Sequence, residues 1–167
     1  MMMISMLVAA AAAEPVPFQI AWMTEYETHK PVLVAKSGTD DRYVGVGCSR
    51  DITPKLVPVV RMAGMKDFWA EPGILAGGHR VRFTFDEGAE QRGRWLGRGE
   101  WVSATHQASR PVEFIAGLTK GSHVKVRIYE VGSRYVEGEF SYTGAADAIA
   151  EISRRCGVPA DGTSAKK

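Results

Sequence analysis

The stretch His79-Arg-Val-Arg-Phe-Thr-Phe-Asp86 alternates apolar and polar residues along its length. Successive side chains of a β-strand point to opposite faces, so Val81, Phe83 and Phe85 share one face while the arginines and the threonine share the other. The alternation therefore predicts a strand with one face in the hydrophobic core and the other face in water.

Two further runs of this kind cover 123–130 and 136–142, and the segment Val131-Gly-Ser-Arg134 between them predicts a β-hairpin. Weaker strand patterns recur earlier in the chain. They cover Phe18–Thr24, Val32–Lys36, Tyr43–Cys48, Leu56–Met62 and Arg92–Ala104. Within the Leu56 strand, Pro58 has no backbone N–H to donate and therefore predicts an edge position.

The sequence also predicts two helices. Pro111–Leu118 has a proline at a first-turn position and ends before Gly121. Ala145–Cys156 has apolar residues at the i, i+3, i+4 and i+7 positions of one face, and Gly157 follows its last turn. Together these patterns predict a mainly β (α+β) fold, an antiparallel two-sheet, β-sandwich-like domain with a short helix and a C-terminal helix.

Cys48 and Cys156 are the two cysteines of the chain, and they are far apart without CxxC spacing. In an oxidising compartment such a pair predicts one structural disulfide. The bond would pin the C-terminal helix onto the sheet that the helix covers. Two separate buried thiols are the alternative.

Residues 1–13 carry no charge and run from apolar residues into alanines, with Ala11 and Ala13 at an A-x-A cleavage site. This pattern predicts a secretory signal peptide and hence a periplasmic or secreted protein, the alternative being an alanine-rich helix or a frayed tail. We expect a single β-rich domain at 14–158 and a flexible C-terminal tail at 159–167. After signal cleavage no segment is apolar for the roughly 20 residues of a transmembrane helix, so none is expected.

Composition and motifs predict no specific chemistry. The net charge of +2 offers no general attraction to nucleic acid, so no nucleic acid is expected as a partner. The common hydrolase, metalloprotease and phosphate-loop motifs do not occur, and no catalytic residues, cofactor or metal are expected. His79 is expected at a solvated strand end, and Asp86, Glu87 and Glu90 are expected in a solvated acidic turn. An envelope hydrolase that uses Asp86 or Glu87 beside His79 is an alternative from a different class.

A basic cluster flanked by tryptophans is the local feature with the strongest binding character. It consists of Arg80, Arg82, Arg92, Arg94 and Arg98, with Trp95 and Trp101 nearby. On the outer face of neighbouring strands, these arginines would suit an anionic polymer or phosphate. The plainer interpretation is that they form the solvated side of an amphipathic sheet, with Asp86 and Glu100 diluting their field.

Several short motifs follow one another in an order typical of known proteins. They are Trp22, Gly45-Val-Gly-Cys48, Val81-Arg-Phe-x-Phe-Asp86, Glu113-Phe-Ile-x-x-Leu118, Val124-Lys-Val-Arg127, Phe140-Ser-Tyr-Thr-Gly144 and Cys156. This succession resembles two related kinds of small periplasmic protein, the type VI secretion-associated accessory proteins and the invasion-associated locus B proteins.

The resemblance implies a two-sheet β domain with a C-terminal helix, without known catalytic residues, and with an accessory or binding role at the cell envelope. It carries over only Cys48 and Cys156, as a structural pair. We therefore expect a non-enzymatic exported protein whose partner is an envelope or secretion-system protein.

Overall fold

The computed structural model describes residues 14–24, 31–49, 54–62, 79–98, 101–103, 111–129 and 134–163. The expected signal peptide at 1–13 lies outside these residues, as do the last four residues of the expected tail. The helices and strands, in chain order, are β1 (Val16–Pro17), β2 (Gln19–Thr24), β3 (Pro31–Gly38), β4 (Tyr43–Ser49), β5 (Lys55–Arg61), β6 (His79–Phe85), β7 (Gln91–Arg98), β8 (Trp101–Ser103), α1 (Pro111–Lys120), β9 (His123–Tyr129), β10 (Tyr135–Thr143) and α2 (Ala145–Cys156).

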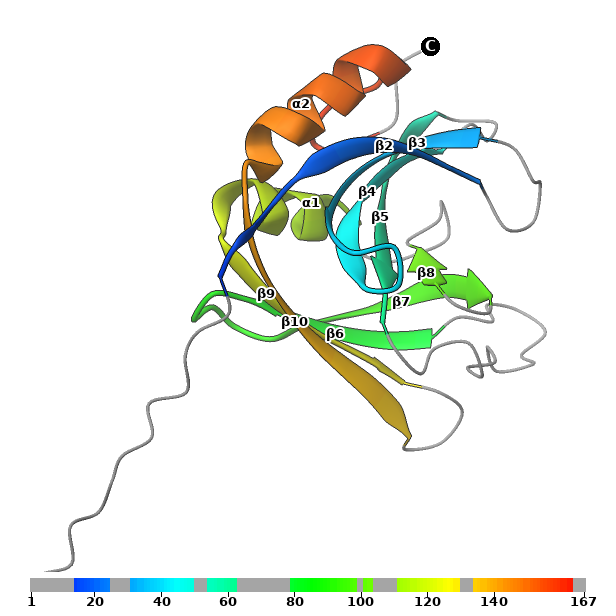
Figure 1. Cartoon of the computed structure of the whole chain (residues 1–167). Coiled ribbons are helices and arrows are strands. Elements are labelled where there is room, and N and C mark those ends of the chain that lie inside the picture. Colours follow the sequence, from blue (N-terminus) through cyan, green and yellow to red (C-terminus); the bar gives the residue numbers. More distant parts are fainter. Residues whose placement is uncertain are drawn as a thin grey trace, which may run out of the picture.

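The strands form two sheets, one of five strands (β2, β3, β4, β5 and β8) and one of four (β7, β6, β9 and β10) (Figure 1). The two sheets are continuous on one side, because β7 pairs with β6 along most of its length and with β8 at its end. On the other side β1 pairs with β10, and the chain then passes through Phe18 into β2, which pairs with β3. The N-terminal stretch therefore bridges the two remaining edges. The predicted mainly β, two-sheet fold is confirmed, although the β1–β10 pair is parallel rather than antiparallel.

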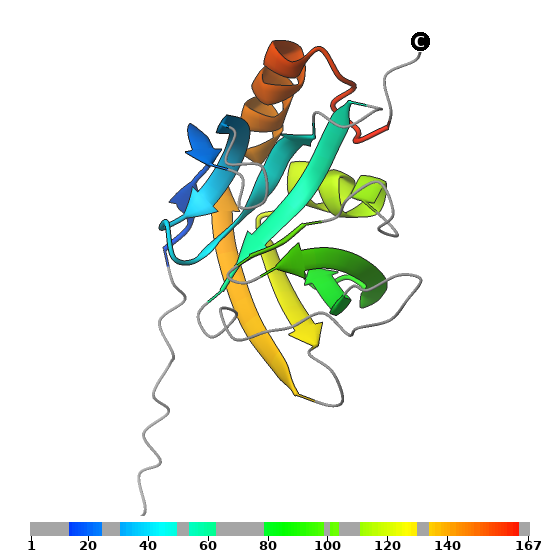
Figure 2. The same ribbon diagram turned by 90° about the vertical axis from the view of Figure 1, so that its right-hand side faces the viewer.

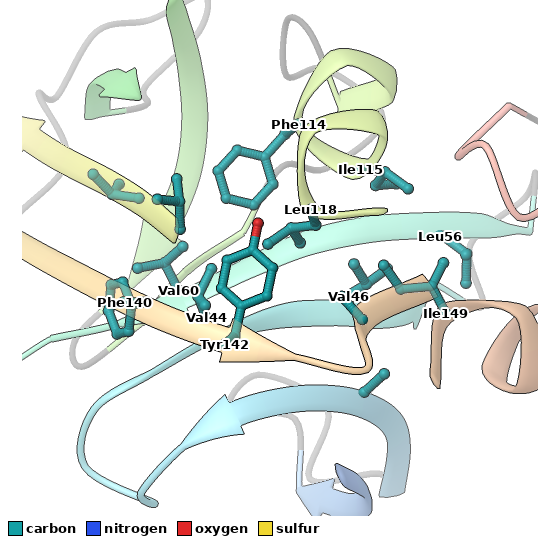
Figure 3. Close-up of a cluster of buried hydrophobic side chains, with 14 of the residues drawn as sticks. Val44, Val46, Leu56, Val60, Phe114, Ile115, Leu118, Phe140, Tyr142 and Ile149 are labelled. Atoms are coloured by element: carbon teal, nitrogen blue, oxygen red, sulfur yellow. The ribbon is translucent and has the colours of Figure 1, made fainter. Parts of the chain in front are cut away.

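The alternating sequence patterns coincide with alternating burial. In β6 the apolar residues Val81 and Phe83 are buried and Arg80 is exposed, and β9 buries Val124, Val126 and Ile128 in the same way. Most of these side chains meet residues of the five-stranded sheet in one hydrophobic core. Figure 3 shows ten labelled members of that core: Val44, Val46, Leu56, Val60, Phe114, Ile115, Leu118, Phe140, Tyr142 and Ile149.

The helix α1 fills the gap between the two sheets. It contacts β5 of one sheet, and its Phe114 packs edge-on against Phe83 of β6 and Trp95 of β7, with ring centroids 5.0 and 4.8 Å apart. Figure 2 shows α1 between β5 and the strands of the other sheet. Because its apolar stripe faces both sheets, α1 holds the four-stranded sheet in a set position relative to the five-stranded one.

The helix α2 has the predicted bounds and packs on α1 and on β2, β3 and β4. Gly157 follows its last residue with φ 67°, and the N–H groups of Gly157 and Val158 bond to the carbonyls of Arg154 and Ser153. This is the Schellman arrangement, in which glycine tolerates the left-handed backbone that ends the helix.

A disulfide joins Cys48, near the end of β4, to Cys156, at the end of α2, with 6.4 Å between the Cα atoms. The predicted bond is therefore confirmed, and it links positions 108 residues apart. On the chain-entropy description a loop of this length stabilises the fold by about 5 kcal/mol. The disulfide fastens α2 to the sheet that it covers.

The position of Pro58 differs from the prediction. Its strand β5 lies inside the sheet, paired with β4 along its length and with β8 at its end. Pro58 is the cross-strand partner of Val46 in β4, and Val59, Val60 and Arg61 pair with β8. The edge assignment is therefore wrong, because β5 has a neighbouring strand on each side.

Past α2, the chain turns back onto the domain. The N–H of Gly162 bonds to the carbonyl of Pro159 at 3.4 Å, and Gly162 lies buried against Ile115 of α1. The described chain therefore stays in contact with the domain beyond the expected boundary at residue 158. Among the residues that the structure describes, no helix is long and apolar enough to cross a membrane.

Candidate functional site

The outer face of the four-stranded sheet gathers arginine and tyrosine side chains from four strands. Strand register places these residues in two rows across the sheet. The first row is Arg94, Arg80, Tyr129 and Tyr135, and the second is Arg92, Arg82, Arg127 and Glu137. We call the four arginines of β6 and β7, with Arg127, Tyr129 and Tyr135, the arginine–tyrosine face.

The tyrosine rings of this face support guanidinium groups. Arg80 and Arg82 lie over the ring of Tyr129, with 5.1 and 5.3 Å between guanidinium carbon and ring centroid, and Arg127 lies over Tyr135 at 4.7 Å. The two rings are themselves 5.4 Å apart. Stacking of this kind holds a planar guanidinium in place by cation–π attraction.

Carboxylates limit the positive charge at two borders of the face. Near the β6–β7 turn, Glu90 lies 3.4 Å from Arg82 and 3.5 Å from Arg92. On β10, Glu137 accepts a hydrogen bond from Nε of Arg127 at 2.8 Å and lies 2.9 Å from Nζ of Lys125. Carboxylates therefore accompany the basic side chains on both pairs of strands, Glu90 beside β6 and β7 and Glu137 on β10.

The β9–β10 ion pairs shift the acid–base behaviour of their members. The hydrogen bond from Lys125, and then that from Arg127, holds the pKa of Glu137 below its ordinary value. Hydrogen bonds with Tyr129 and Glu137 raise the pKa of Arg127, and bonds to Glu137 and Glu139 raise that of Lys125. All three groups therefore stay charged across the neutral range.

Like charges stand directly opposite each other on this face. Arg80 is the cross-strand partner of Arg94, and Arg82 is the partner of Arg92 on one side and of Arg127 on the other. Directly opposed like charges destabilise a sheet by a few tenths of a kcal/mol to about 1 kcal/mol each. Glu90 beside Arg82 and Arg92, and Glu137 beside Arg127, offset part of this repulsion.

Four of the five arginines of the cluster expected from the sequence therefore lie together on this face. Arg80, Arg92 and Arg94 are exposed and Arg82 is partly exposed, all on one face. The side chains of Arg98 and Trp101 lie outside the described residues. Trp95 does not flank the cluster as expected, because it points to the opposite face and is fully buried in the core.

Sequence reasoning missed Arg127, Tyr129 and Tyr135. Alternation in 123–130 shows that Arg127 points outward, so part of the signal was present. What joins these residues to the arginines is the pairing of β6 with β9, two strands separated in sequence by β7, β8 and α1.

No family model, curated protein or solved structure matches this chain. The arrangement of the side chains is therefore the basis for the functional assignment.

The residues of the alternative hydrolase site do not converge. His79 begins β6 and Asp86 follows its end, which separates them by about 23 Å of extended strand. The sequence predicted His79 at a solvated strand end, and this prediction is wrong. The side chain is buried, with 3% of it exposed, and its Nδ1 lies 3.0 Å from the carbonyl oxygen of Tyr129. The acid–histidine pair that this hydrolase needs is not formed by these residues.

Asp86 has a structural position in the turn after β6. Its Oδ1 accepts hydrogen bonds from the backbone N–H groups of Ser122 and His123 at 3.2 and 3.1 Å, and from the hydroxyl of Ser122 at 3.2 Å. The expected turn is present at residues 86–88, and Asp86 itself has φ 46°. The carboxylate joins this turn to the start of β9. Within the described part of the chain, no group of three or more His, Cys, Asp or Glu residues could hold a metal ion.

Proposed function

We propose that the protein is a non-enzymatic accessory or binding protein of the bacterial cell envelope, exported to the periplasm or beyond. The observation that carries the proposal is the arginine–tyrosine face, where Arg80, Arg82, Arg92 and Arg94 stand on one exposed surface beside Tyr129 and Tyr135. A gathering of arginine and tyrosine side chains on one exposed surface suits binding, because both residue types are enriched at protein–protein interfaces.

The disulfide supports the exported location. Bonds of this kind persist in oxidising compartments such as the periplasm and are rare in the reducing cytoplasm. The apolar segment at 1–13 with its A-x-A site supplies a route of export. Association with a secretion system rests on the resemblance to the type VI secretion-associated and invasion-associated locus B proteins, and belongs to the same proposal.

The hydrolase alternative receives no support from the described geometry. Asp86 is engaged in holding the start of β9, and His79 is buried at the other end of β6. A binding role needs neither residue to react, and it uses the surface on which the charged side chains do gather.

Cell fractionation tests the export half of the proposal. The full chain with a C-terminal tag, expressed in a Gram-negative bacterium, should appear in the osmotic-shock fraction with both thiols blocked to alkylation. A matched chain that lacks residues 2–13 should stay in the cytoplasm with Cys48 and Cys156 reduced. Cytoplasmic retention of the full chain with free thiols would contradict export.

Retention on envelopes tests the binding half. Purified protein should sediment with washed cell envelopes, and retention should fall when Arg80 and Arg82 are both replaced by glutamine. Replacing Arg154 and Arg155 of α2 in the same way removes equal charge from another surface and should leave retention unchanged. Turnover of an envelope substrate that disappears in the Asp86→Asn variant would instead establish the hydrolase.

A further inference from the structure

The strand β2 forms one edge of the five-stranded sheet. It pairs with β3 along its whole length, from Gln19 opposite Lys36 to Thr24 opposite Pro31, and the order of the described strands ends with it (Figure 1). In an antiparallel pair, alternate residues direct their N–H and C=O groups away from the neighbouring strand. Half of the six residues of β2 therefore direct these groups to a side on which no described strand lies.

The composition of β2 does not protect this edge. Its sequence Gln19-Ile-Ala-Trp-Met-Thr24 contains no charged residue, no proline and no glycine, and its register with β3 is continuous, without a bulge. Charges, proline and bulges are the features by which natural edge strands prevent another strand from pairing with them. The side chain of Trp22 is also 62% exposed. An uncharged edge of this kind is suited to pairing with a further strand.

Both faces of β2 carry apolar side chains up to the edge. On the core side, Trp22 stands opposite the buried Leu33, and Ile20 packs against the same hydrophobic core. On the other side, Met23 packs against a smaller apolar cluster that includes Val34. A strand added to this edge would therefore extend both apolar faces, and its side chains would meet the exposed indole of Trp22.

We propose that β2 pairs with the β2 strand of a second copy of the protein, in antiparallel orientation and with the two Trp22 residues opposite each other. This pairing joins two five-stranded sheets into one continuous sheet. The contact lies on a different sheet from the arginine–tyrosine face and adds self-association to the binding role proposed above.

Two-fold symmetry limits the register of such a pair. Directly opposite residues of an antiparallel pair lie on the same face of the sheet, and a two-fold axis makes every contact reciprocal. The axis must therefore lie level with one residue of β2, because an axis between two residues would pair opposite faces. The register centred on Trp22 sets Ile20 opposite Thr24 and Ala21 opposite Met23. It is the register that places the most exposed side chain of the strand against itself, and opposed aromatic side chains stabilise such a pair.

The chemistry of β2 suits a second copy. Because the strand is uncharged, two copies meet without the repulsion that opposed like charges would cause. The contact is small, since five residue pairs and two indoles of about 150–250 Å² each bury less than the roughly 1,200 Å² of a stable complex. We therefore expect a weak dimer, with a dissociation constant of about 10–500 μM.

Sedimentation velocity measures this self-association over protein concentrations from about 1 μM to about 1 mM. The sedimentation coefficient should rise from the monomer value to the dimer value, and the dissociation constant should change less than about twofold between about 0.05 and 0.5 M salt, because no charges meet. Trp22→Lys should weaken the dimer about tenfold or more, since it removes the aromatic pair and sets two like charges opposite each other.

The matched control is Val112→Lys, which adds the same charge at an exposed apolar position of α1. It should leave the dissociation constant within about twofold of that of the original protein, because Val112 lies on another element. Thermal unfolding of each variant checks that the fold is retained.

Cross-linking tests the register. Cys48 and Cys156 are bonded to each other, so a cysteine introduced into β2 is the single free thiol. Directly opposite Cα atoms lie about 4.5–5.5 Å apart, within the range of a disulfide, so Trp22→Cys should form a disulfide-linked dimer under mild oxidation. Thr24→Cys is the control, because two residues at position 24 would be offset by about 13 Å along the strands. We expect it to cross-link about fivefold or more slowly.

Three results would overturn the proposed dimer. The first is a protein that stays monomeric at about 1 mM, and the second is a dimer that persists unchanged in Trp22→Lys. The third is equal cross-linking of Trp22→Cys and Thr24→Cys, which would exclude the register centred on Trp22. A monomer that instead captures an envelope protein through Trp22 would assign the edge to a strand of a different protein and would also overturn the pairing of two copies.

Discussion

The backbone of Gly117 in α1 lies against the ring of Phe85 at the end of β6, so that a Cβ at position 117 would stand 2.2 Å from two ring carbons. The ring of Phe85 in turn packs on Phe114 with centroids 5.2 Å apart. The absence of a side chain at Gly117 therefore lets α1 lie directly against a ring of β6.

Replacing Gly117 with alanine should lower the free energy of unfolding by about 1–2 kcal/mol in urea titrations. Alanine gains up to about 1 kcal/mol of helix propensity, but the overlap with the partly buried ring of Phe85 costs about 1–3 kcal/mol or more. Adding Phe85→Leu should recover part of the loss, because leucine leaves space for the new methyl group. A stabilised Gly117→Ala protein would show that α1 can move away from β6 without penalty.

Removing the disulfide should lower the free energy of unfolding by about 4–5 kcal/mol on the loop-entropy description. Cys48 and Cys156 are 108 residues apart in the sequence, and the bond between them closes this loop. Cys48 is buried beside α2. Denaturant unfolding with and without dithiothreitol measures the difference. The Cys48→Ala, Cys156→Ala protein is the control, because it should unfold at the same concentration in both conditions. Equal stability of oxidised and reduced protein would contradict the stabilising role.

The carboxylate of Glu137 should make a pH-dependent contribution to stability. Its pKa in the folded protein is lowered, first by Lys125 and then by Arg127, below the unfolded value of about 4.3. A lowered folded pKa means that the contribution is present above the unfolded pKa and is lost as the pH falls through the folded pKa.

We therefore expect Glu137→Gln to cost at most about 1 kcal/mol at pH 7, and the difference from the original protein to shrink toward pH 3. The measurement is unfolding by urea at several pH values. Guanidinium chloride is unsuitable as the denaturant because, as a salt, it screens the ion pairs. Glu139→Gln on the same strand is the comparison, with an expected smaller effect since Glu139 is the more exposed group. A difference that grows on acidification would reverse the assigned sign.

Replacing Asp86 with alanine should lower the free energy of unfolding more than replacing it with asparagine. Alanine loses the acceptor for two N–H groups and one hydroxyl, and it is less tolerant of the left-handed backbone at φ 46° than aspartate or asparagine. We expect a loss of about 1–3 kcal/mol for Asp86→Ala and about 1 kcal/mol or less for Asp86→Asn, measured by denaturant unfolding. The adjacent Glu87→Ala should change stability by less than about 0.5 kcal/mol. Equal losses of stability in Asp86→Ala and Glu87→Ala would contradict the structural role of Asp86.

Local patterns in the sequence were sufficient for several elements. The bounds of α2 follow from the spacing of its apolar residues and from Gly157, and the inward residues of β6 and β9 follow from alternation. The disulfide also followed from the number of cysteines and the expected compartment. These features depend on residues close together in the chain, or on covalent chemistry that allows only one pairing of two cysteines.

Local sequence patterns predicted only part of the candidate site. Alternation placed Arg80, Arg82, Arg92 and Arg94 on outward positions, but Tyr129 and Arg127 joined them only through the pairing of β6 with β9. Nothing in a strand's own pattern specifies which distant strand lies beside it, because that choice depends on how all the apolar faces are buried together.

The sequence by itself determined the class of the fold, the last helix and the outward direction of the arginines. Tertiary structure alone decided that His79 and Trp95 are buried, that Pro58 lies inside a sheet and that the N-terminal stretch bridges two sheet edges. The physical reason is that periodicity reports which side of an element is apolar, whereas burial and neighbours depend on what the rest of the chain places against that side.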